Sequence, residues 1–246
     1  MDSASSESSR APGDVRDGER HSDVAGFITK NMPLAPAPSV PEIRLHMAHP
    51  GSGLRRLSRR DGHGANAPPY WAYSWAGGAA LARHFFARPE TVFGRRVLDL
   101  GAGSGLVGIA AAKCGASQVI AAEIDPDALV AIGLNAAANG VAVEAIAADI
   151  ASAEVPPVDL IAAGDVFYDR ALAESAADFF VRCLVKGVAV LVGDVGRAYL
   201  PRAQLRLLAE YPVRDFGDSK SATWKSGGVF SYEPSGAQSA EREDLV

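Results

Sequence analysis

From residue 97 onward, short apolar runs alternate with longer segments in which apolar residues recur at a helical spacing. The short runs suit strands that are buried on both faces, and the longer segments suit helices. Strands and helices in alternation predict βαβ units, which form a parallel sheet with helices on both faces. Because the crossovers of such units are right-handed, we expect a doubly wound α/β domain. The expected strands span residues 97–100, 118–122, 142–147, 158–163 and 187–192, and the expected helices span residues 105–114, 126–139, 171–184 and 200–210.

Two more apolar runs follow these units. Residues 213–216 and 229–232 have the pattern of strands, and a loop without a helix joins them. Strands that are joined in this way can pair antiparallel. The complete prediction is therefore a Rossmann-like, mostly parallel seven-stranded sheet with an antiparallel C-terminal strand.

The pattern before this region is less regular. Apolar residues alternate with polar ones over residues 41–47, which predicts a half-buried strand. A helix is expected over residues 77–87, because a proline two residues later stops it. Residues 25–40 predict a short apolar element followed by a proline-rich connector. Residues 1–24 mix serine, glycine and charged residues with almost nothing to bury, so we expect them to be disordered.

These patterns divide the 246 residues into one α/β domain with additions at both ends. We expect a disordered tail (1–24), an N-terminal extension that covers the site (25–90), a core domain (91–234) and a flexible C-terminal tail (235–246).

Composition narrows the classes of function. A net charge of -5 argues against a protein that binds nucleic acid through a generally basic surface. No apolar run approaches the roughly 20 residues of a membrane helix, and the N-terminus lacks the pattern of a signal peptide. Cys114 and Cys183 have no CxxC spacing, and the histidines have no metal-ligand spacing. We therefore expect a cytoplasmic monomer that binds no metal, no nucleic acid and no membrane.

Two ligand motifs overlap in the glycine-rich loop after residue 100. The spacing Gly103-x-Gly105-x-x-Gly108 fits the dinucleotide fingerprint. The spacing Asp99-x-Gly101-x-Gly103-x-Gly105 fits the loop of methyltransferases. The carboxylate of Asp99 would repel a pyrophosphate, whereas it complements the sulfonium and ammonium groups of S-adenosylmethionine. The loop therefore favours S-adenosylmethionine as the cofactor.

Acidic residues at the ends of the next two strands agree with a nucleoside ligand. Glu123 ends the second strand, where an acidic side chain accepts both ribose hydroxyls. Asp125 is a rival for this role, but its place before a proline suits a helix cap. Asp149 ends the third strand and can accept a hydrogen bond from the adenine amino group, or it is a plain loop residue.

The segment after the fourth strand must line the same crevice, because open α/β sheets bind ligands outside the carboxyl ends of their strands. Asp165 can accept hydrogen bonds from a substrate amine, and Phe167 and Tyr168 can form walls against an alkyl chain. Phe167 is also a candidate for the core, and Asp169 is a candidate helix cap. Because a carboxylate favours the charged form of an adjacent amine, we expect Asp165 to position the amine rather than act as a strong base.

Several segments resemble the electron transfer flavoprotein β-subunit lysine methyltransferases, a family of class I (seven-β-strand) S-adenosylmethionine-dependent methyltransferases. The glycine loop alone indicates only the superfamily, whereas WAGG at 75–78 and GDVFYD at 164–169 indicate the family. Ala76 and Glu123 are mild departures, because family members often have proline and aspartate there. The matching segments are 41–45, 69–72, 75–78, 97–103, 124–126, 164–169 and 193–197.

The resemblance implies an enzyme that methylates a lysine of a protein, with the electron transfer flavoprotein β subunit as the expected partner. It also implies that Trp75 contacts the cofactor, where its ring would attract the sulfonium by about 0.5–2 kcal/mol. Trp71 or Tyr73 is instead expected to serve packing. The resemblance, the glycine loop and the acidic positions together predict the cofactor-binding residues Trp75, Gly78, Asp99, Gly101, Gly103, Gly105, Glu123, Ile124, Asp149, Gly164 and Asp165. The predicted catalytic residues are Asp165 and Tyr168.

Other functions share parts of this pattern. A ribosomal-protein methyltransferase has most of the loop, and a small-molecule amine methyltransferase needs the same cofactor. An NAD-binding oxidoreductase is a more distant alternative. The basic run at residues 54–60 is either a solvated loop or a surface that docks an acidic protein.

Overall fold

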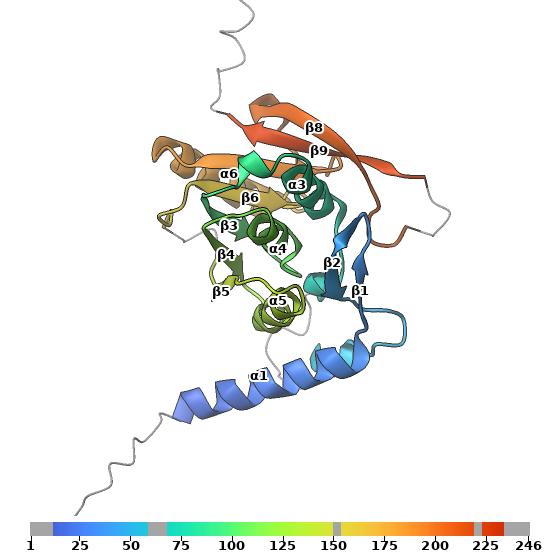
Figure 1. Ribbon diagram of the computed structural model, residues 1–246. Helices are drawn as coiled ribbons and strands as arrows, with labels where there is room; N and C mark the ends of the chain where they lie inside the picture. The colour runs from blue at the N-terminus through green and yellow to red at the C-terminus, as the bar shows by residue number, and fades with distance from the viewer. Residues whose placement is uncertain (1–11, 59–67, 150–153, 219–222, 234–246) are drawn as a thin grey trace, which may run out of the picture.

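A computed structural model describes residues 12–58, 68–149, 154–218 and 223–233, with a seven-stranded sheet at its centre (Figure 1). The strands of the sheet are β3 (Arg96–Leu100), β4 (Gln118–Glu123), β5 (Glu144–Ala147), β6 (Leu160–Gly164), β7 (Ala189–Asp194), β8 (Leu205–Val213) and β9 (Lys225–Tyr232). Their order across the sheet is β5-β4-β3-β6-β7-β9-β8. The strands from β3 to β7 are parallel, and β9 is antiparallel to both of its neighbours. The predicted fold class is confirmed.

Helices cover both faces of this sheet. On one face lie α3 (Ala76–Ala87), α4 (Leu106–Lys113) and α5 (Pro126–Ala138), and on the other lies α6 (Arg170–Val185). Val97 packs in the cluster with α3 and α4, whereas its neighbour Leu98 packs in the cluster with α6. Successive residues of a strand point to opposite faces. Burial on both sides explains why these strands are continuous apolar runs.

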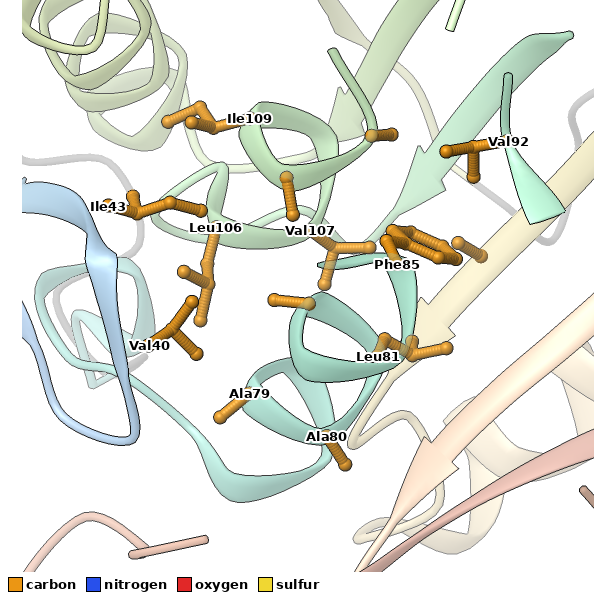
Figure 2. Close-up of a cluster of buried hydrophobic side chains, with 14 of the residues drawn as sticks. Val40, Ile43, Ala79, Ala80, Leu81, Phe85, Val92, Leu106, Val107 and Ile109 are labelled. Atoms are coloured by element: carbon orange, nitrogen blue, oxygen red, sulfur yellow. The ribbon is translucent and has the colours of Figure 1, made fainter. Parts of the chain in front are cut away.

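Figure 2 shows the cluster on the face of α3 and α4. Leu81 and Phe85 of α3 lie near Val107 of α4, and Ile43 approaches α4 from an N-terminal strand. All four residues are buried. This packing fixes α3, which carries one wall of the site described below.

The first described element is α1 (Pro12–Asn31). We expected disorder over residues 1–24, but the structure extends the helix back to Pro12, and earlier residues lie outside the described part of the chain. Val24, Ile28 and Met32 stand at four-residue intervals and are buried against α5. This stripe stabilises a helix whose first half is too polar for the sequence to predict.

A hairpin of β1 (Leu34–Ala37) and β2 (Val40–His46) follows and forms a two-stranded sheet of its own. The predicted strand is confirmed by β2, in which Ile43 and Leu45 are fully buried. We expected a connector in place of β1. A turn through Ser39, at a φ of 67°, brings this proline-containing segment beside β2. Proline is tolerated in such an edge strand.

The end of the chain also differs from the prediction. We expected a helix over residues 200–210 and a strand over 213–216. In the structure β8 begins inside the expected helix, at Leu205, and ends at Val213, and it pairs with β9 along its length. Leucines at 205, 207 and 208 suit a helix as well as a strand, so the pattern alone does not decide. The partner strand decides, and it lies elsewhere in the sequence.

The first turn of α3 packs so closely on the sheet that only glycine fits at the contact. A Cβ added to Gly193 on β7 would clash with the carbonyl oxygen of Gly77. A Cβ added to Gly164 on β6 would lie 2.7 Å from the Cα of Gly78. These glycines therefore bring the N-terminus of α3 directly onto the carboxyl ends of β6 and β7.

Substitution of Gly193 by alanine tests this contact. Gly193→Ala is expected to lower the free energy of unfolding by about 1–3 kcal/mol, because the added methyl group displaces α3. Gly133→Ala is the control: Gly133 is exposed in α5, and a Cβ there meets no atom within 4 Å. The control is expected to gain about 0.5–1 kcal/mol from helix propensity. Urea unfolding measures the free energy of unfolding of both variants. A Gly193→Ala variant as stable as the wild type would contradict the close contact.

Candidate active site

A small cavity lies where the ends of β3 and β6 meet the first turn of α3. Most of the predicted cofactor-binding residues line it, namely Trp75, Gly78, Asp99, Gly101, Gly103, Gly164 and Asp165. Open α/β sheets bind ligands at this edge. The fold thus brings together three separate segments of the sequence, residues 73–78, 99–107 and 164–165.

The other predicted residues follow the same edge of the sheet but lie outside the lining of the cavity. Gly105 is the N-cap of α4. Glu123 ends β4, and Ile124 follows it with 70% of its surface exposed. Asp149 is exposed just after β5, and Tyr168 is exposed after β6. Since β5, β4 and β3 are adjacent, Glu123 and Asp149 continue the site away from Asp165.

The glycine loop adopts a backbone that other residues rarely adopt. The φ angles of Gly101, Gly103 and Gly105 are 64°, 52° and 80°. A side chain at any of these positions would be strained. The loop therefore exposes bare backbone at the cavity, as the motif predicted.

Asp99 is buried beneath this loop, with 1% of its surface exposed. Its Oδ2 accepts a hydrogen bond of 2.8 Å from the backbone N–H of Gly108, in the first turn of α4. Burial raises the pKa of Asp99 to about 7, more than this hydrogen bond lowers it. The side chain thus ties β3 to α4 and titrates near neutral pH.

Glu123 holds the loop from the neighbouring strand. Its Oε2 accepts a hydrogen bond of 3.0 Å from the N–H of Gly103, and its Oε1 accepts one of 2.8 Å from the N–H of Ile124. The rival Asp125 is the N-cap of α5, where it accepts from Asp127 N–H, as the sequence indicated. The side chain of Glu123 remains half-buried beside the loop.

Asp165 binds the N-terminus of α3. Its Oδ2 accepts hydrogen bonds from the N–H groups of Gly77 and Gly78, at 2.6 and 3.0 Å. Its Oδ1 accepts from Nε and Nη2 of Arg197, at 3.0 and 2.7 Å. Burial raises the pKa of Asp165 to about 6, although the Arg197 guanidinium opposes the shift. Asp165 is therefore mainly ionised at neutral pH, and both of its oxygens have partners within the protein.

Arg197 and Asp215 are site residues that the sequence analysis missed. The guanidinium of Arg197 contacts both Asp165 and Asp215, with Nη1 3.0 Å from Oδ2 of Asp215. Arg197 belongs to a segment of the family resemblance, at 193–197, to which we gave no role. Asp215 fell in a predicted strand, so no signal marked it.

Aromatic rings surround the mouth of the cavity. Tyr70 packs edge-on against Trp75 and Tyr168, at centroid distances of 5.5 and 5.6 Å. The ring centroids of Tyr73 and Phe216 lie 3.9 Å apart, and both rings pack against Trp75. Tyr73 lines the cavity, so of the two residues that we expected to serve packing only Trp71 is wholly buried in the core.

Two residues after β6 have structural roles. Asp169 is the N-cap of α6 and accepts a hydrogen bond from Leu172 N–H, as the sequence indicated. Phe167 has no exposed surface and belongs to the core, so the expectation that it forms a wall against an alkyl chain was wrong.

Cys114 and Cys183 are free thiols. Among the described residues, no group of His, Cys, Asp or Glu is placed to hold a metal ion. No helix in the described ranges is long and apolar enough to cross a membrane.

A larger groove of about 740 Å³ lies at the opposite ends of β4 and β5, between α4 and α5. Small apolar side chains line most of it, and Glu144 is its one charged residue within the described chain. The glycine loop and the predicted carboxylates are absent from its lining. The smaller cavity is therefore the candidate for the reactive centre.

Asp99 gives the stability of the protein a testable dependence on pH. Between about pH 4 and pH 7 the folded protein keeps a proton on Asp99 that the unfolded chain has lost, so this contribution to stability falls as the pH rises. Relative to Asp99→Asn, wild-type stability is expected to decrease over this range and to level off above about pH 8. Urea unfolding at several pH values measures the difference. A constant difference would show that the pKa of Asp99 is not raised.

Comparison with known proteins identifies related methyltransferases. A family model described as ribosomal protein L11 methyltransferase (PrmA) matches residues 89–168. The electron transfer flavoprotein beta subunit lysine methyltransferase of Danio rerio is 37% identical over 82% of this chain and 83% of its own length. The protein of the same name from Homo sapiens is 32% identical over 86% and 83%.

The fold has a counterpart among solved structures. A putative RNA methyltransferase from Pyrococcus horikoshii superposes with a TM-score of 0.51 at 15% identity, covering 69% of this chain and 91% of that protein. This likeness shows the shared fold alone. The level of identity to the named relatives, over most of both chains, shows more: this chain belongs to the electron transfer flavoprotein β-subunit lysine methyltransferase family of class I S-adenosylmethionine-dependent methyltransferases.

Proposed function

We propose that this chain transfers methyl groups from S-adenosylmethionine to a lysine side chain of the electron transfer flavoprotein β subunit. The observation that carries the proposal is the match to relatives of that name over more than four fifths of the chain. The match includes the segments that form the cavity, so it is not limited to the glycine loop. The cytoplasmic location, the monomeric state and the lack of a nucleic-acid partner remain predictions.

The charges of the cavity fit this cofactor. Two carboxylates, those of Asp99 and Asp165, line the cavity, and among the residues that the structure describes no lysine or arginine belongs to its lining. A dinucleotide would bring a pyrophosphate, for which such a lining offers no counter-charge. S-adenosylmethionine carries a sulfonium and an ammonium, which the carboxylate of Asp99 complements, since that of Asp165 is paired with Arg197. Asp99 and the glycine loop would hold its methionine end, and Glu123 its ribose.

When bound, S-adenosylmethionine supplies an electrophilic methyl group. A neutral lysine amine would take this methyl group through its lone pair as the S–C bond breaks, and the methylated ammonium would then lose a proton to water. Asp165 already accepts four hydrogen bonds from Gly77, Gly78 and Arg197, so it shapes the cavity rather than removing the proton. Partial burial raises the pKa of Tyr168 above its usual 10, so the hydroxyl of this half-exposed residue keeps its proton. It can accept a hydrogen bond from the amine and orient it.

A ribosomal protein is the second candidate substrate. The family model for ribosomal protein L11 methyltransferase supports it, but this model matches only residues 89–168. That range contains the glycine loop and the segment after β6. It leaves out Trp75, Arg197 and Phe216. The match therefore supports the assignment of the cofactor site more than the identity of the acceptor protein.

Substitution of Glu123 tests the cofactor site. Glu123→Ala is expected to weaken the binding of S-adenosylhomocysteine by about 10- to 100-fold, because hydrogen bonds to a charged group are lost. Glu144→Ala is the matched control, since Glu144 is an exposed glutamate at the opposite end of the neighbouring strand. Isothermal titration calorimetry measures both affinities. Equal affinities would exclude Glu123 from the nucleoside site.

The substrate is tested by methylation in vitro. Purified electron transfer flavoprotein, from the same source as this chain, is incubated with the enzyme and S-adenosylmethionine, and its β subunit is analysed by mass spectrometry. We expect methyl groups on lysine with the wild type and strongly reduced methylation with Glu123→Ala. Ribosomal protein L11 is assayed in parallel. Methylation of L11 but not of the β subunit would contradict the proposal.

A further inference from the structure

The segment after β8 contributes Asp215 to the edge of the site. The carboxylate of Asp215 receives two contacts from Arg197, at 3.1 Å from Nη2 to Oδ1 and at 3.0 Å from Nη1 to Oδ2. Its Oδ1 also accepts a hydrogen bond of 3.3 Å from the N–H of Ala76, in the first turn of α3. Only 6% of this side chain is exposed. Asp215 is therefore fixed both to α3 and to the loop after β7.

The fixed carboxylate determines where the next residue lies. The backbone N–H of Phe216 donates a hydrogen bond of 3.0 Å to Oδ1 of Asp215. The ring of Phe216 packs against Tyr73 and Trp75, at centroid distances of 3.9 and 5.3 Å. Tyr73 and Trp75 both line the cavity.

Phe216 is nevertheless 48% exposed. A large ring that is fixed by aromatic packing on one side and open to solvent on the other suits a contact surface better than a core. The proposed acceptor, a lysine, has a flexible aliphatic stem and a polar end that must reach the cavity. Such stems pack favourably along apolar surfaces.

We propose that Phe216 is a specificity-determining residue that contacts the aliphatic stem of the acceptor lysine, and that Asp215 is the positioning residue that holds it there. The inference rests on the proposed function, because it takes a lysine of a protein as the acceptor. Tyr73 and Trp75 complete the aromatic wall, and Arg197 anchors the wall to Asp165.

The test compares variants of Phe216 with a matched control. Phe216→Ala is expected to raise the KM for the acceptor protein about 10-fold, with kcat and the affinity for S-adenosylhomocysteine within about twofold of wild type. Phe216→Tyr keeps the ring and is expected to restore a KM near that of the wild type. Phe93→Ala, which removes an exposed phenylalanine beside the opposite end of β3, is expected to leave all three constants unchanged.

The role of Asp215 is tested in a double-mutant cycle. Asp215→Ala is expected to raise the acceptor KM by a similar factor, because the ring of Phe216 is no longer held. If Asp215 acts through that ring, Asp215→Ala adds little to Phe216→Ala. Fully additive effects would overturn the positioning role. Thermal unfolding of each variant checks that the fold is retained.

Two results would overturn the role of Phe216. One is an acceptor KM of Phe216→Ala within twofold of the wild type. The other is a fall in its affinity for S-adenosylhomocysteine in parallel with the KM effect, which would show that the ring covers the cofactor instead.

The wild-type arm separates this inference from the proposed function. If the wild type does not methylate the electron transfer flavoprotein β subunit, that substrate is wrong, and the comparison is repeated with the protein that the wild type labels in cell extract. If Phe216→Ala labels this protein about tenfold more slowly than the wild type at low acceptor concentration, the inference about Phe216 is supported. An unchanged rate, or no labelled protein at all, overturns it.

Discussion

The shape of the site depends on the carboxylate of Asp165. This buried group joins three segments: the end of β6, the first turn of α3 and, through Arg197, the loop after β7. A helix N-terminus has N–H groups without partners and a partial positive charge, and a carboxylate satisfies both. The guanidinium of Arg197 completes the compensation that a buried charge requires. Loss of Arg197 would leave the buried carboxylate of Asp165 without its counter-charge, and loss of Asp165 would leave the N–H groups of α3 without an acceptor.

This cap explains two unusual features of the backbone. Asp165 has a φ of 57°, which places its carboxylate towards α3 rather than along β6. Aspartate is one of the few non-glycine residues that adopt this region. The glycines at 77 and 193 allow α3 to approach closely enough for the cap to form. The small residues of the WAGG segment and the aspartate after β6 therefore serve one contact, which is a physical reason for their joint appearance in the family pattern.

The sequence predicted those parts of the molecule whose determinants are close together in the chain. The glycine loop with Asp99 forms a contiguous strand, turn and helix. Its spacing indicated the local structure but fitted two ligand motifs, and the charge of Asp99 favoured S-adenosylmethionine. Asp165 was found as well, but its partners were not, because Gly77 and Arg197 come from distant segments. The same reason explains the wrong helix over 200–210. There the decisive information is the pairing of β8 with β9, and the amphipathic pattern of β8 is ambiguous.

The two carboxylates of the cavity differ in what surrounds them, and this difference assigns their roles. Asp165 has a guanidinium and two N–H groups as partners, and its pKa of about 6 leaves it ionised at neutral pH. Asp99 has one N–H group and a neighbouring negative charge on Glu123, and its pKa of about 7 leaves it partly protonated. A cation bound in the cavity would favour the ionised form of Asp99, so ligand binding and loss of this proton are linked. The charge of Asp165 is thus used within the protein, to hold α3, whereas the charge of Asp99 is the one that can respond to a cationic cofactor.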